Sequence, residues 1–487
     1  MAGSVQTTPG FDLQPSAQQV PLATNYITNF DFLNQYLPDT YEKEFERYGN
    51  RTISSFLRMV GAEMPSNSDL IKWAEQGRLH TKYVNCTTTV VTNSDTATFT
   101  INDTLVPNRV TTIGTAGSIA IRVGQTIMIS PKTLAGAVAT TNKAIVTAVD
   151  TSAGTIDVAF YEALGLSNDN VANIFEIFVY GSEFKKGQVG MDGSLEADDE
   201  IFETSPIILK DKYAVSGSDM AQIGWVEVTT ENGATGYLWY MKSEHETRLR
   251  FDDYLETAMI EAVPAEAGSG VAAVSPTSVV GNKGSEGIFY TVENRGNVWS
   301  GGNPSTLADF DNIIRRLDKQ GSIEENVIFL NREFGFDIDD MLAAQNSYGA
   351  GGTSYGLFDN DKDMALNLGF TGFRRGYDFY KTDWKYLNDP TMRGGLSSTL
   401  GTDTVNGLLV PAGSTTVYDQ VLGKNAKRPF LHVRYRASET EDRRYKTWIT
   451  GSAGGAMNSD LDAMEVHFLS ERAVCTMGAN NFFIFKD

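Results

Sequence analysis

The sequence contains very little cysteine and histidine, which excludes two kinds of scaffold. Only 2 cysteines and 4 histidines occur among the 487 residues. Cys86 and Cys475 lie far apart in the chain, so they give neither a disulfide framework nor the paired spacing of a zinc site. We therefore expect no disulfide, no structural metal and no cofactor, and a fold that is held together by its hydrophobic cores.

Long apolar runs and early basic residues are also missing. No stretch approaches the roughly 18 uninterrupted apolar residues that a membrane-spanning helix needs. The first basic residue is Lys43, so the N-terminus lacks the basic region of a secretory signal. The sequence thus predicts a soluble protein that is not exported by that route.

Positive charge is scarce as well. The chain has 61 acidic against 40 basic residues and a formal charge of -21. Wrapping by duplex DNA depends on Lys and Arg releasing counterions from phosphate, so this balance excludes a simple DNA-wrapping protein. The length predicts two to four domains, and the 41% of hydrophobic residues is that of an ordinary globular protein.

The first part of the chain, 1–83, is predicted to be an N-terminal arm followed by short helices. Prolines and glutamines without an apolar period fill the first 35 or so residues, which is typical of an arm that orders on a partner. From Tyr41 to Trp73 the apolar residues follow mostly helical spacing, with a break at Gly49. Two or three short helices are expected there.

Residues 84–180 are rich in Thr, Val and Ile and are interrupted at short intervals by Asn, Asp or Gly. Short, regularly spaced strands of this kind predict an all-β barrel or sandwich. The expected strands are Thr96–Ile101, Ile119–Val123, Gln125–Ile129, Ala144–Val149 and Thr155–Phe160.

The segment 181–222 contains an acidic stretch and is predicted to be an extended, solvated loop or hairpin. In the following segment, 223–299, a long helix is expected over 237–263, with an apolar face that includes Phe251, Tyr254 and Leu255. A linker rich in Gly, Ser, Ala and Val follows at 264–285.

The remainder mixes helices and strands. Within 300–450, Thr306 begins a predicted helix that ends at Gly321, and a buried strand over 326–331 and another helix from Ile338 follow. The last segment, 451–487, returns to strands. The chain as a whole is therefore expected to be α+β.

Two motifs have the spacing of catalytic or cofactor sites, but their contexts argue against them. Gly352–Gly356 matches the nucleophile elbow around Ser354, yet the flanking residues are those of a loop and not of a strand and a helix. Gly268–Ala273 loosely matches a dinucleotide fingerprint, but it follows a helix instead of a strand. We expect no catalytic residues; a hydrolase that uses Ser354 remains the least favoured alternative.

Metal binding is equally weakly indicated. His245 lacks a second His four residues later, so no zinc motif is present there. Asp359, Asp361 and Asp363 have the spacing of a calcium loop, but the Gly and the Glu expected at its sixth and twelfth positions are absent. These three aspartates are weak candidates only, and an Asx turn is the simpler interpretation.

Basic residues gather late in the chain. Arg374 and Arg375 precede an aromatic stretch, and Arg443 and Arg444 lie in a second basic cluster. Such a combination is compatible with single-stranded nucleic acid, but interleaved acids favour a contact between subunits. The acidic residues Asp198, Asp199 and Glu200 form the complementary candidate surface.

In its order of elements, the chain resembles the major capsid proteins of tailed bacteriophages with the Hong Kong 97-like (HK-97-like) fold. The resemblance covers most of the chain and includes the stretch Gly369–Gly376 and the helix-strand unit Thr306–Asn331. It is greatest to the capsid proteins of crAss-like gut phages. The resemblance implies an N-terminal arm (1–83), an extended loop (181–222), a peripheral domain (223–299) with its spine helix, an axial domain (300–450) and a return to the peripheral domain (451–487). The all-β module at 84–180 would be an inserted domain.

The same resemblance implies a function and partners. Copies of the chain would form hexamers and pentamers of the icosahedral head shell, assembled in the bacterial cytoplasm and enclosing double-stranded DNA without sequence-specific binding. Portal, scaffold and decoration or head-fibre proteins would be further partners, and no membrane is involved. The alternative from another class is a surface adhesin or glycan-binding protein in which the β module is the binding unit.

Overall fold

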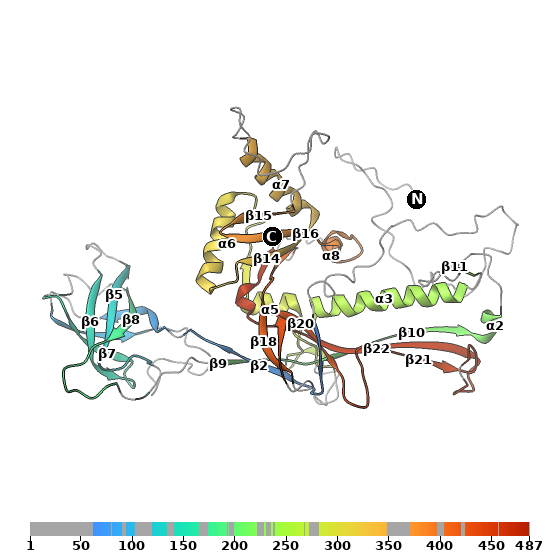
Figure 1. Cartoon of the computed structure of the whole chain (residues 1–487), viewed down its shortest axis with the longest axis horizontal. Coiled ribbons are helices and arrows are strands. Elements are labelled where there is room, and N and C mark those ends of the chain that lie inside the picture. Colours follow the sequence, from blue (N-terminus) through green and yellow to red (C-terminus); the bar gives the residue numbers. More distant parts are fainter. Residues whose placement is uncertain are drawn as a thin grey trace. The chain divides into compact units, whose positions relative to one another are not determined.

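The computed structural model describes the chain in segments and divides it into two compact units. The described residues are 62–78, 80–89, 94–102, 119–133, 141–163, 165, 174–191, 193, 199–221, 228–229, 235–236, 239–266, 268–271, 282–347, 371–396, 404–419, 424–455 and 457–486. One unit is Lys72–Phe202, and the other contains the chain on both sides of it. The elements are labelled in Figure 1.

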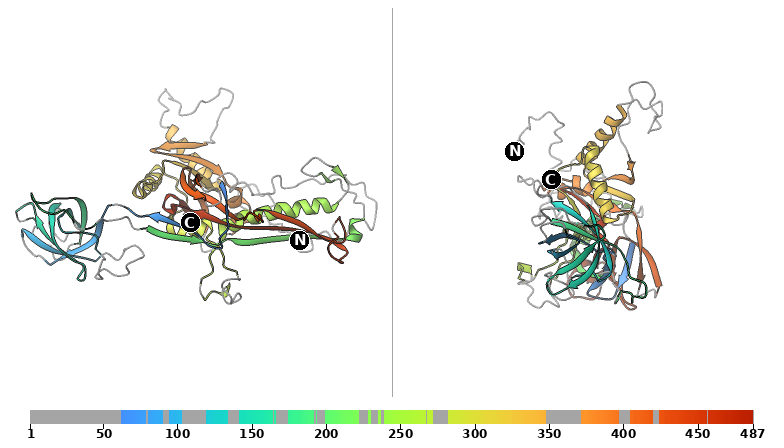
Figure 2. Two further views of the ribbon diagram at one scale, coloured as in Figure 1. Left: turned by 60° about the horizontal axis from the view of Figure 1, so that its bottom comes forward. Right: turned by 90° about the vertical axis from the view of Figure 1, so that its left-hand side faces the viewer.

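The first of these units contains a closed six-stranded antiparallel barrel in the order β3-β4-β7-β6-β5-β8 (Figures 1 and 2). Alternate side chains point inward and form a core that includes Phe99, Ile127 and Ile177. The period-2 pattern of Val, Ile and Thr explains why these residues form strands with one buried face. The strands are β3 (Lys82–Thr88), β4 (Thr96–Ile101), β5 (Gln125–Thr133), β6 (Asn142–Asp150), β7 (Thr155–Phe160) and β8 (Ile174–Ser182).

The other unit has a five-stranded sheet centred on the long strand β22 (Ala463–Thr476). β10 (Ile207–Ser216) pairs antiparallel along one side of β22, whereas β20 (Leu431–Arg436) and β21 (Lys446–Gly451) pair with its two ends. β1 (Ala62–Ser66) adds a parallel strand to β20. Sheet A, as we call these five strands, is covered on one face by helix α3.

Helix α3 (Trp239–Glu261) lies along β10 and β22 (Figure 1). Phe251 and Leu255 of the helix pack on Val466 and Phe468 of β22. Twenty-three residues at 1.5 Å each span about 35 Å, and such a length requires a long partner to cover the apolar side of the helix. Tyr254, expected on the apolar face, is instead 49% exposed.

Sheet F, the second sheet of this unit, has six strands in the order β13-β23-β17-β14-β16-β15 and mixes parallel with antiparallel pairs. Helix α6 is capped by Thr306 and Asp309 at its start and by Gly321 at its end, as the sequence predicts. Its residues Phe310, Ile313 and Leu317 pack on the sheet. The elements are α5 (Ile288–Arg295), β13 (Asn297–Trp299), α6 (Leu307–Gln320), β14 (Glu325–Leu330), α7 (Arg332–Ser347), β15 (Gly372–Arg375), β16 (Tyr377–Asp383), α8 (Lys385–Asn388), η4 (Arg393–Gly395), β17 (Val405–Pro411), η5 (Ala479–Asn481) and β23 (Phe483–Lys486).

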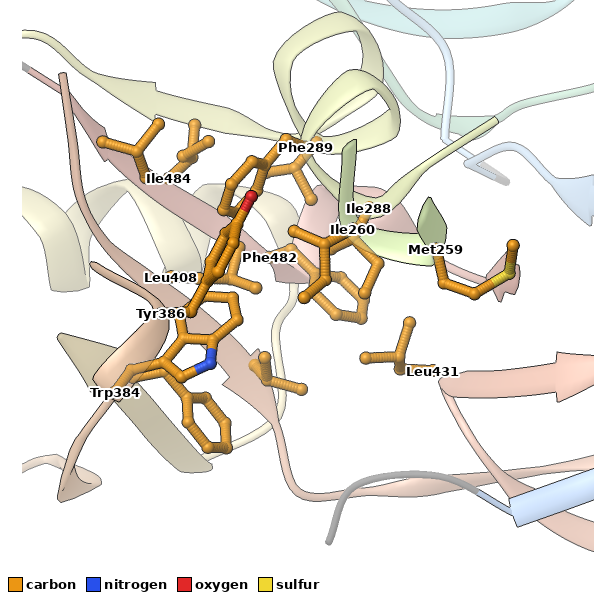
Figure 3. Close-up of a cluster of buried hydrophobic side chains, with 14 of the residues drawn as sticks. Met259, Ile260, Ile288, Phe289, Trp384, Tyr386, Leu408, Leu431, Phe482 and Ile484 are labelled. Carbon is orange, nitrogen blue, oxygen red and sulfur yellow. The ribbon is translucent and has the colours of Figure 1, made fainter. Parts of the chain in front are cut away.

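One hydrophobic cluster connects the two sheets (Figure 3). Met259 and Ile260 at the end of α3 meet Phe289 of α5 and Trp384 beside α8 in the same cluster. Side chains from β20 and β22 of sheet A and from β17 and β23 of sheet F complete it.

The remaining short elements are β2 (Ile71–Gln76) with β9 (Asp199–Thr204), β11 (Val228–Thr229) with β12 (Thr235–Gly236), β18 (Ser414–Asp419) with β19 (Lys424–Pro429), and α2 (Gly217–Met220).

Two predictions of local structure were wrong. The helix expected up to Trp73 is replaced by β1 and β2, because those strands pair with β20 and β9, which are distant in the sequence. Ile119–Val123 is not a strand: the chain turns at Val123 and Gly124, where Gly124 has a φ of +87°, although Ile119 and Ile121 are still buried.

The predicted segment boundaries also differ from the observed units and sheets. The segment 181–222 is not simply a loop, because it contains β9 and the ten-residue strand β10. The boundary at 450 does not separate the two sheets. β20 and β21, before it, belong to sheet A, and β23, after it, belongs to sheet F. Sequence position alone does not reveal such crossovers.

Candidate subunit interface

The residues proposed from the sequence to carry subunit contacts fall at separate places. Asp198 lies outside the described residues; Asp199 and Glu200 begin β9, and Glu200 is exposed. Arg374 and Arg375 end β15 at the edge of sheet F. The cluster with Arg443 and Arg444 lies directly before β21 at the margin of sheet A.

The two arginines of β15 already have carboxylate partners within the chain. Nε of Arg374 lies 3.1 Å from Oδ1 of Asp378, and the Arg374 side chain is still 72% exposed. Arg375 makes a two-point contact with Asp311 of α6, in which Nη2 donates to Oδ2 at 2.9 Å. These hydrogen bonds from Arg375 hold the pKa of the Asp311 carboxyl below its usual value.

The second arginine pair is part of a denser network. Nε of Arg443 donates to Oε2 of Glu471 on β22 at 2.6 Å, and Arg444 forms an ion pair with Glu63 of β1. The carbonyl of Arg444 also accepts hydrogen bonds from Oγ of Ser470 at 2.6 Å and from Nη2 of Arg472 at 3.0 Å. This network fastens β1 and the loop before β21 to β22.

Arg472 is the buried member of this network. Its residue surface is only 8% exposed, and burial lowers the pKa of its guanidinium below the usual value. Nη1 lies 4.0 Å from Oε1 of Glu63, which therefore stands between two arginines. The sequence singled out Arg443 and Arg444 as a basic cluster but not Glu63 or Arg472. The only signal for them in the sequence was their charge.

A further polar site joins α3 to the segment between β16 and β17 of sheet F. Tyr386 of α8 donates to Oε1 of Glu261 at 2.6 Å, and Nη1 of Arg393 donates to Oε2 of the same carboxylate at 2.6 Å. The guanidinium of Arg393 also lies 5.3 Å from the ring centroid of Phe289. Burial, and then the Glu261 carboxylate, raise the pKa of the Tyr386 phenol. Sequence reasoning missed this site because its three polar residues lie on separate elements.

All the weak catalytic and metal candidates lie outside the described residues; they are Ser354, Asp359, Asp361 and Asp363. Within the described ranges no group of three or more His, Cys, Asp or Glu residues is arranged to hold a metal ion. His467 stacks on Trp448, with ring centroids 5.0 Å apart, and Nε2 lies 2.8 Å from Oγ1 of Thr450.

Two other expectations from the sequence can be followed in the structure. Both cysteines are free thiols in the interior, and burial raises the pKa of Cys475 to about 12. Gly268–Val271 follows the end of α3, with Gly268 at a φ of +88°, so it does not have the strand-to-helix context of a dinucleotide site. Among the described helices, none is both long and apolar enough to cross a membrane.

Comparisons with known proteins give no match in sequence. No family model matches the chain, and neither does any curated protein. Among solved structures, a chain from Microbacterium phage Oxtober96 is similar at 10% identity and a TM-score of 0.37, with 93% of this chain and 96% of that chain covered. The mature capsid of bacteriophage PhiM1 is similar at 11% identity and a TM-score of 0.31, covering 63% and 78%. The holo-SrpI encapsulin complex from Synechococcus elongatus gives 9% identity and a TM-score of 0.31, covering 60% and 77%.

Proposed function

We propose that this chain is the major capsid protein of a tailed bacteriophage with the Hong Kong 97-like fold. Its copies assemble into hexamers and pentamers of an icosahedral shell around double-stranded DNA. We further propose that the phage is crAss-like and that the shell forms in the bacterial cytoplasm. The protein is not an enzyme in this proposal, and it uses no cofactor.

The observation that carries the proposal is the pairing of α3 with the long strands of sheet A. A 23-residue helix on strands of 10 and 14 residues makes an elongated two-layer body, and sheet F with its own helices makes a second mixed body. We propose that the first body is the peripheral domain with its spine helix and that the second is the axial domain, the two domains that the sequence resemblance implies. Elongated layers expose much surface for their volume, which suits a subunit that contacts several neighbours.

The net charge is consistent with this function. A formal charge of -21 repels the phosphate backbone, so a shell of such chains encloses DNA without sequence-specific binding. Many individually weak contacts between copies become stable together in a closed shell. Portal, scaffold and decoration or head-fibre proteins would complete the particle.

The test is electron microscopy of the purified full chain together with sedimentation velocity over a salt series. The proposal expects shells, hexamers or pentamers, with the state of assembly changing with salt. A uniform monomer under all conditions, also after co-expression with the head proteins of a phage, would contradict it. That result would favour the alternative of a monomeric glycan-binding protein.

For the contacts themselves, we propose that Asp198, Asp199 and Glu200 meet the arginines of an adjacent copy, at either Arg374/Arg375 or Arg443/Arg444. Each of these arginines has a carboxylate partner within its own chain. A carboxylate from a neighbouring copy would therefore share the guanidinium with that partner. Arg374 is the most accessible of the four, with 72% of its side chain exposed.

Charge reversal tests this contact. Changing the three acids to Lys is expected to prevent assembly at low salt, where such pairs count most. The matched control reverses three other exposed acids, Glu162, Glu266 and Glu439, and alters the net charge equally. If the two triple variants assemble alike, the acidic stretch is not the contact.

A further inference from the structure

One outer wall of the barrel carries an apolar and aromatic patch. Lys143 of β6, Met128 of β5 and Phe178 of β8 are in register across three neighbouring strands. Their neighbours Ile127, Ile129 and Ile177 point into the barrel core, so the alternation of the strands places Met128 and Phe178 on the outside. Both are only partly buried.

A β-bulge adds an exposed aromatic ring to this wall. The register between β5 and β8 shifts, so that Thr126 pairs with Gly181 and Ile127 with Val179, which leaves Tyr180 as the extra residue. Bulges re-aim side chains, and the Tyr180 residue is 47% exposed. The ammonium of Lys143 lies 5.8 Å from the centroid of its ring.

Tyr161, just after β7, completes the patch. Its backbone N–H donates to the carbonyl of Lys143 at 3.1 Å, and the residue is 50% exposed. Its phenol is hydrogen-bonded to the exposed carboxylate of Glu183. Burial, and then this hydrogen bond, raise the pKa of Tyr161 to about 12, so it remains a neutral donor. The barrel patch, as we call Met128, Lys143, Tyr161, Phe178, Tyr180 and Glu183, is thus one connected surface.

The composition of the barrel patch is that of a protein contact. Aromatic residues and Met are enriched at the centres of interfaces, where rigid rings are buried at little entropic cost. The barrel already has a full core of inward side chains, so the outer rings are not needed to close it. The patch itself contains one cation and one carboxylate, and Lys82, which is in register with Phe178, is paired with Glu176 at 2.6 Å.

Charge balance points to the partner. With a formal charge of -21 per chain, two copies repel each other over most of their surfaces. A patch with one Lys and one Glu is self-complementary under a two-fold axis, since the Lys of each copy can face the Glu of the other. We propose that the barrel patch is an isologous contact between two copies, in which Lys143 of each copy faces Glu183 of the other and the aromatic rings are buried between them.

This inference rests on the proposed function, because it adds a weak contact to the many that copies would make in a shell. The test is a mixing experiment with two full-length variants, Lys143→Glu and Glu183→Lys. Each variant alone places like charges opposite each other, whereas a mixture of the two restores opposite charges. We expect each variant to self-associate at least about tenfold more weakly than the parent and the mixture to recover the association, measured by sedimentation and by capture of one tagged variant with the other.

A second pair of variants separates the contact from folding. Tyr180→Ser removes an exposed ring of the patch and should weaken association, whereas Tyr254→Ser, which removes a ring of similar exposure on α3, should not. Circular dichroism then checks that the barrel is intact. Self-association of both charge variants at the parent's level would overturn the inference. So would a loss that mixing does not restore, which would assign the patch to a different partner.

Failure of the barrel contact and failure of the proposed capsid function would give different results. Shells that form equally well in all four variants would overturn the barrel contact and leave the capsid proposal standing. Dimers that depend on the patch, without any shell in the presence of the head proteins, would contradict the capsid proposal and support the contact.

Discussion

Tyr386 and Glu261 are joined by a 2.6 Å hydrogen bond, although 125 positions separate them in the sequence. Glu261 is the last residue of α3, where a carboxylate faces the negative end of the helix dipole. The phenol of Tyr386 and the guanidinium of Arg393 compensate this charge. The three side chains therefore hold the end of α3 on the segment that connects β16 and β17 of sheet F.

Removing the Tyr386 hydroxyl tests the strength of this connection. Tyr386→Phe is expected to lower the free energy of unfolding by about 1–2 kcal/mol, because it leaves one oxygen of a partly buried carboxylate without its donor. Chemical denaturation measures the change. Tyr380→Phe, on the exposed side of β16, should change stability by less than about 0.5 kcal/mol. Equal effects of the two substitutions would mean that the hydrogen bond contributes nothing.

Glu63 is expected to be needed for stability because it neutralises two arginines. Glu63→Gln leaves the buried guanidinium of Arg472 without its nearest carboxylate and removes the ion pair with Arg444. We expect a loss of roughly 1–3 kcal/mol, seen as a lower midpoint of denaturant unfolding. Glu439→Gln, in an exposed turn, is the control and should be near neutral. If Glu63→Gln unfolds at the same denaturant concentration as the parent, the ion pairs of Glu63 do not contribute to holding β1 in sheet A.

Gly451 is expected to tolerate no side chain. Its φ is +126°, and a Cβ at this position would lie 1.8 Å from the carbonyl oxygen of Ala463 on β22. Gly451→Ala should cost more than about 3 kcal/mol, since both the backbone and the strand pairing must shift. Gly455, with a φ of +89° and open space around it, gives the matched control, and its change to Ala should cost about 1 kcal/mol. Thermal unfolding of both variants separates the clash from the strain.

The tyrosines predict a loss of stability in alkali. Burial raises the pKa values of Tyr377 and Tyr445 to about 12, and the hydrogen bond from Tyr377 to Asp318 adds to the effect. In the unfolded chain these phenols ionise near pH 10, so between about pH 10 and pH 12 the unfolded state binds fewer protons than the native state. This contribution to stability is complete below pH 10 and is lost as the pH rises through 12.

Ultraviolet absorption of phenolate measures this directly. The native chain should show phenols that titrate about two pH units later than those of the denatured chain, and Tyr377→Phe should remove one of them. Coincident titration of native and denatured chains would refute the prediction.

The thiols should be unreactive in the folded chain. Cys86 and Cys475 are both buried, which shields them from reagents, and burial raises the pKa of Cys475 to about 12, so almost no Cys475 thiolate is present near neutral pH. A thiol reagent is expected to label neither cysteine under native conditions and both in denaturant. Rapid labelling of the native chain would show that the barrel core around Cys86 or the interior around Cys475 of β22 opens readily.

Local sequence determined the elements whose signals are contained within one segment. The helix from Leu307 to Gln320 follows from its capping box, its apolar spacing and Gly321, because these act over one to four residues. The strands Thr96–Ile101 and Thr155–Phe160 follow from their two-residue period. Helix α3 was predicted within two residues at each end, since its apolar side chains recur at helical spacing.

Tertiary structure decided what depends on partners distant in the chain. Ile71–Gln76 is a strand because β9 pairs with it, and β20 and β21 belong to sheet A because β22 is long enough to hold both along one side. The sequence pointed to Arg443 and Arg444 as charges, but only the fold supplied Glu471 and Glu63 as their carboxylates. Local patterns determine which surfaces a segment must bury, whereas the identity of the covering surface depends on contacts between distant segments, which no local pattern encodes.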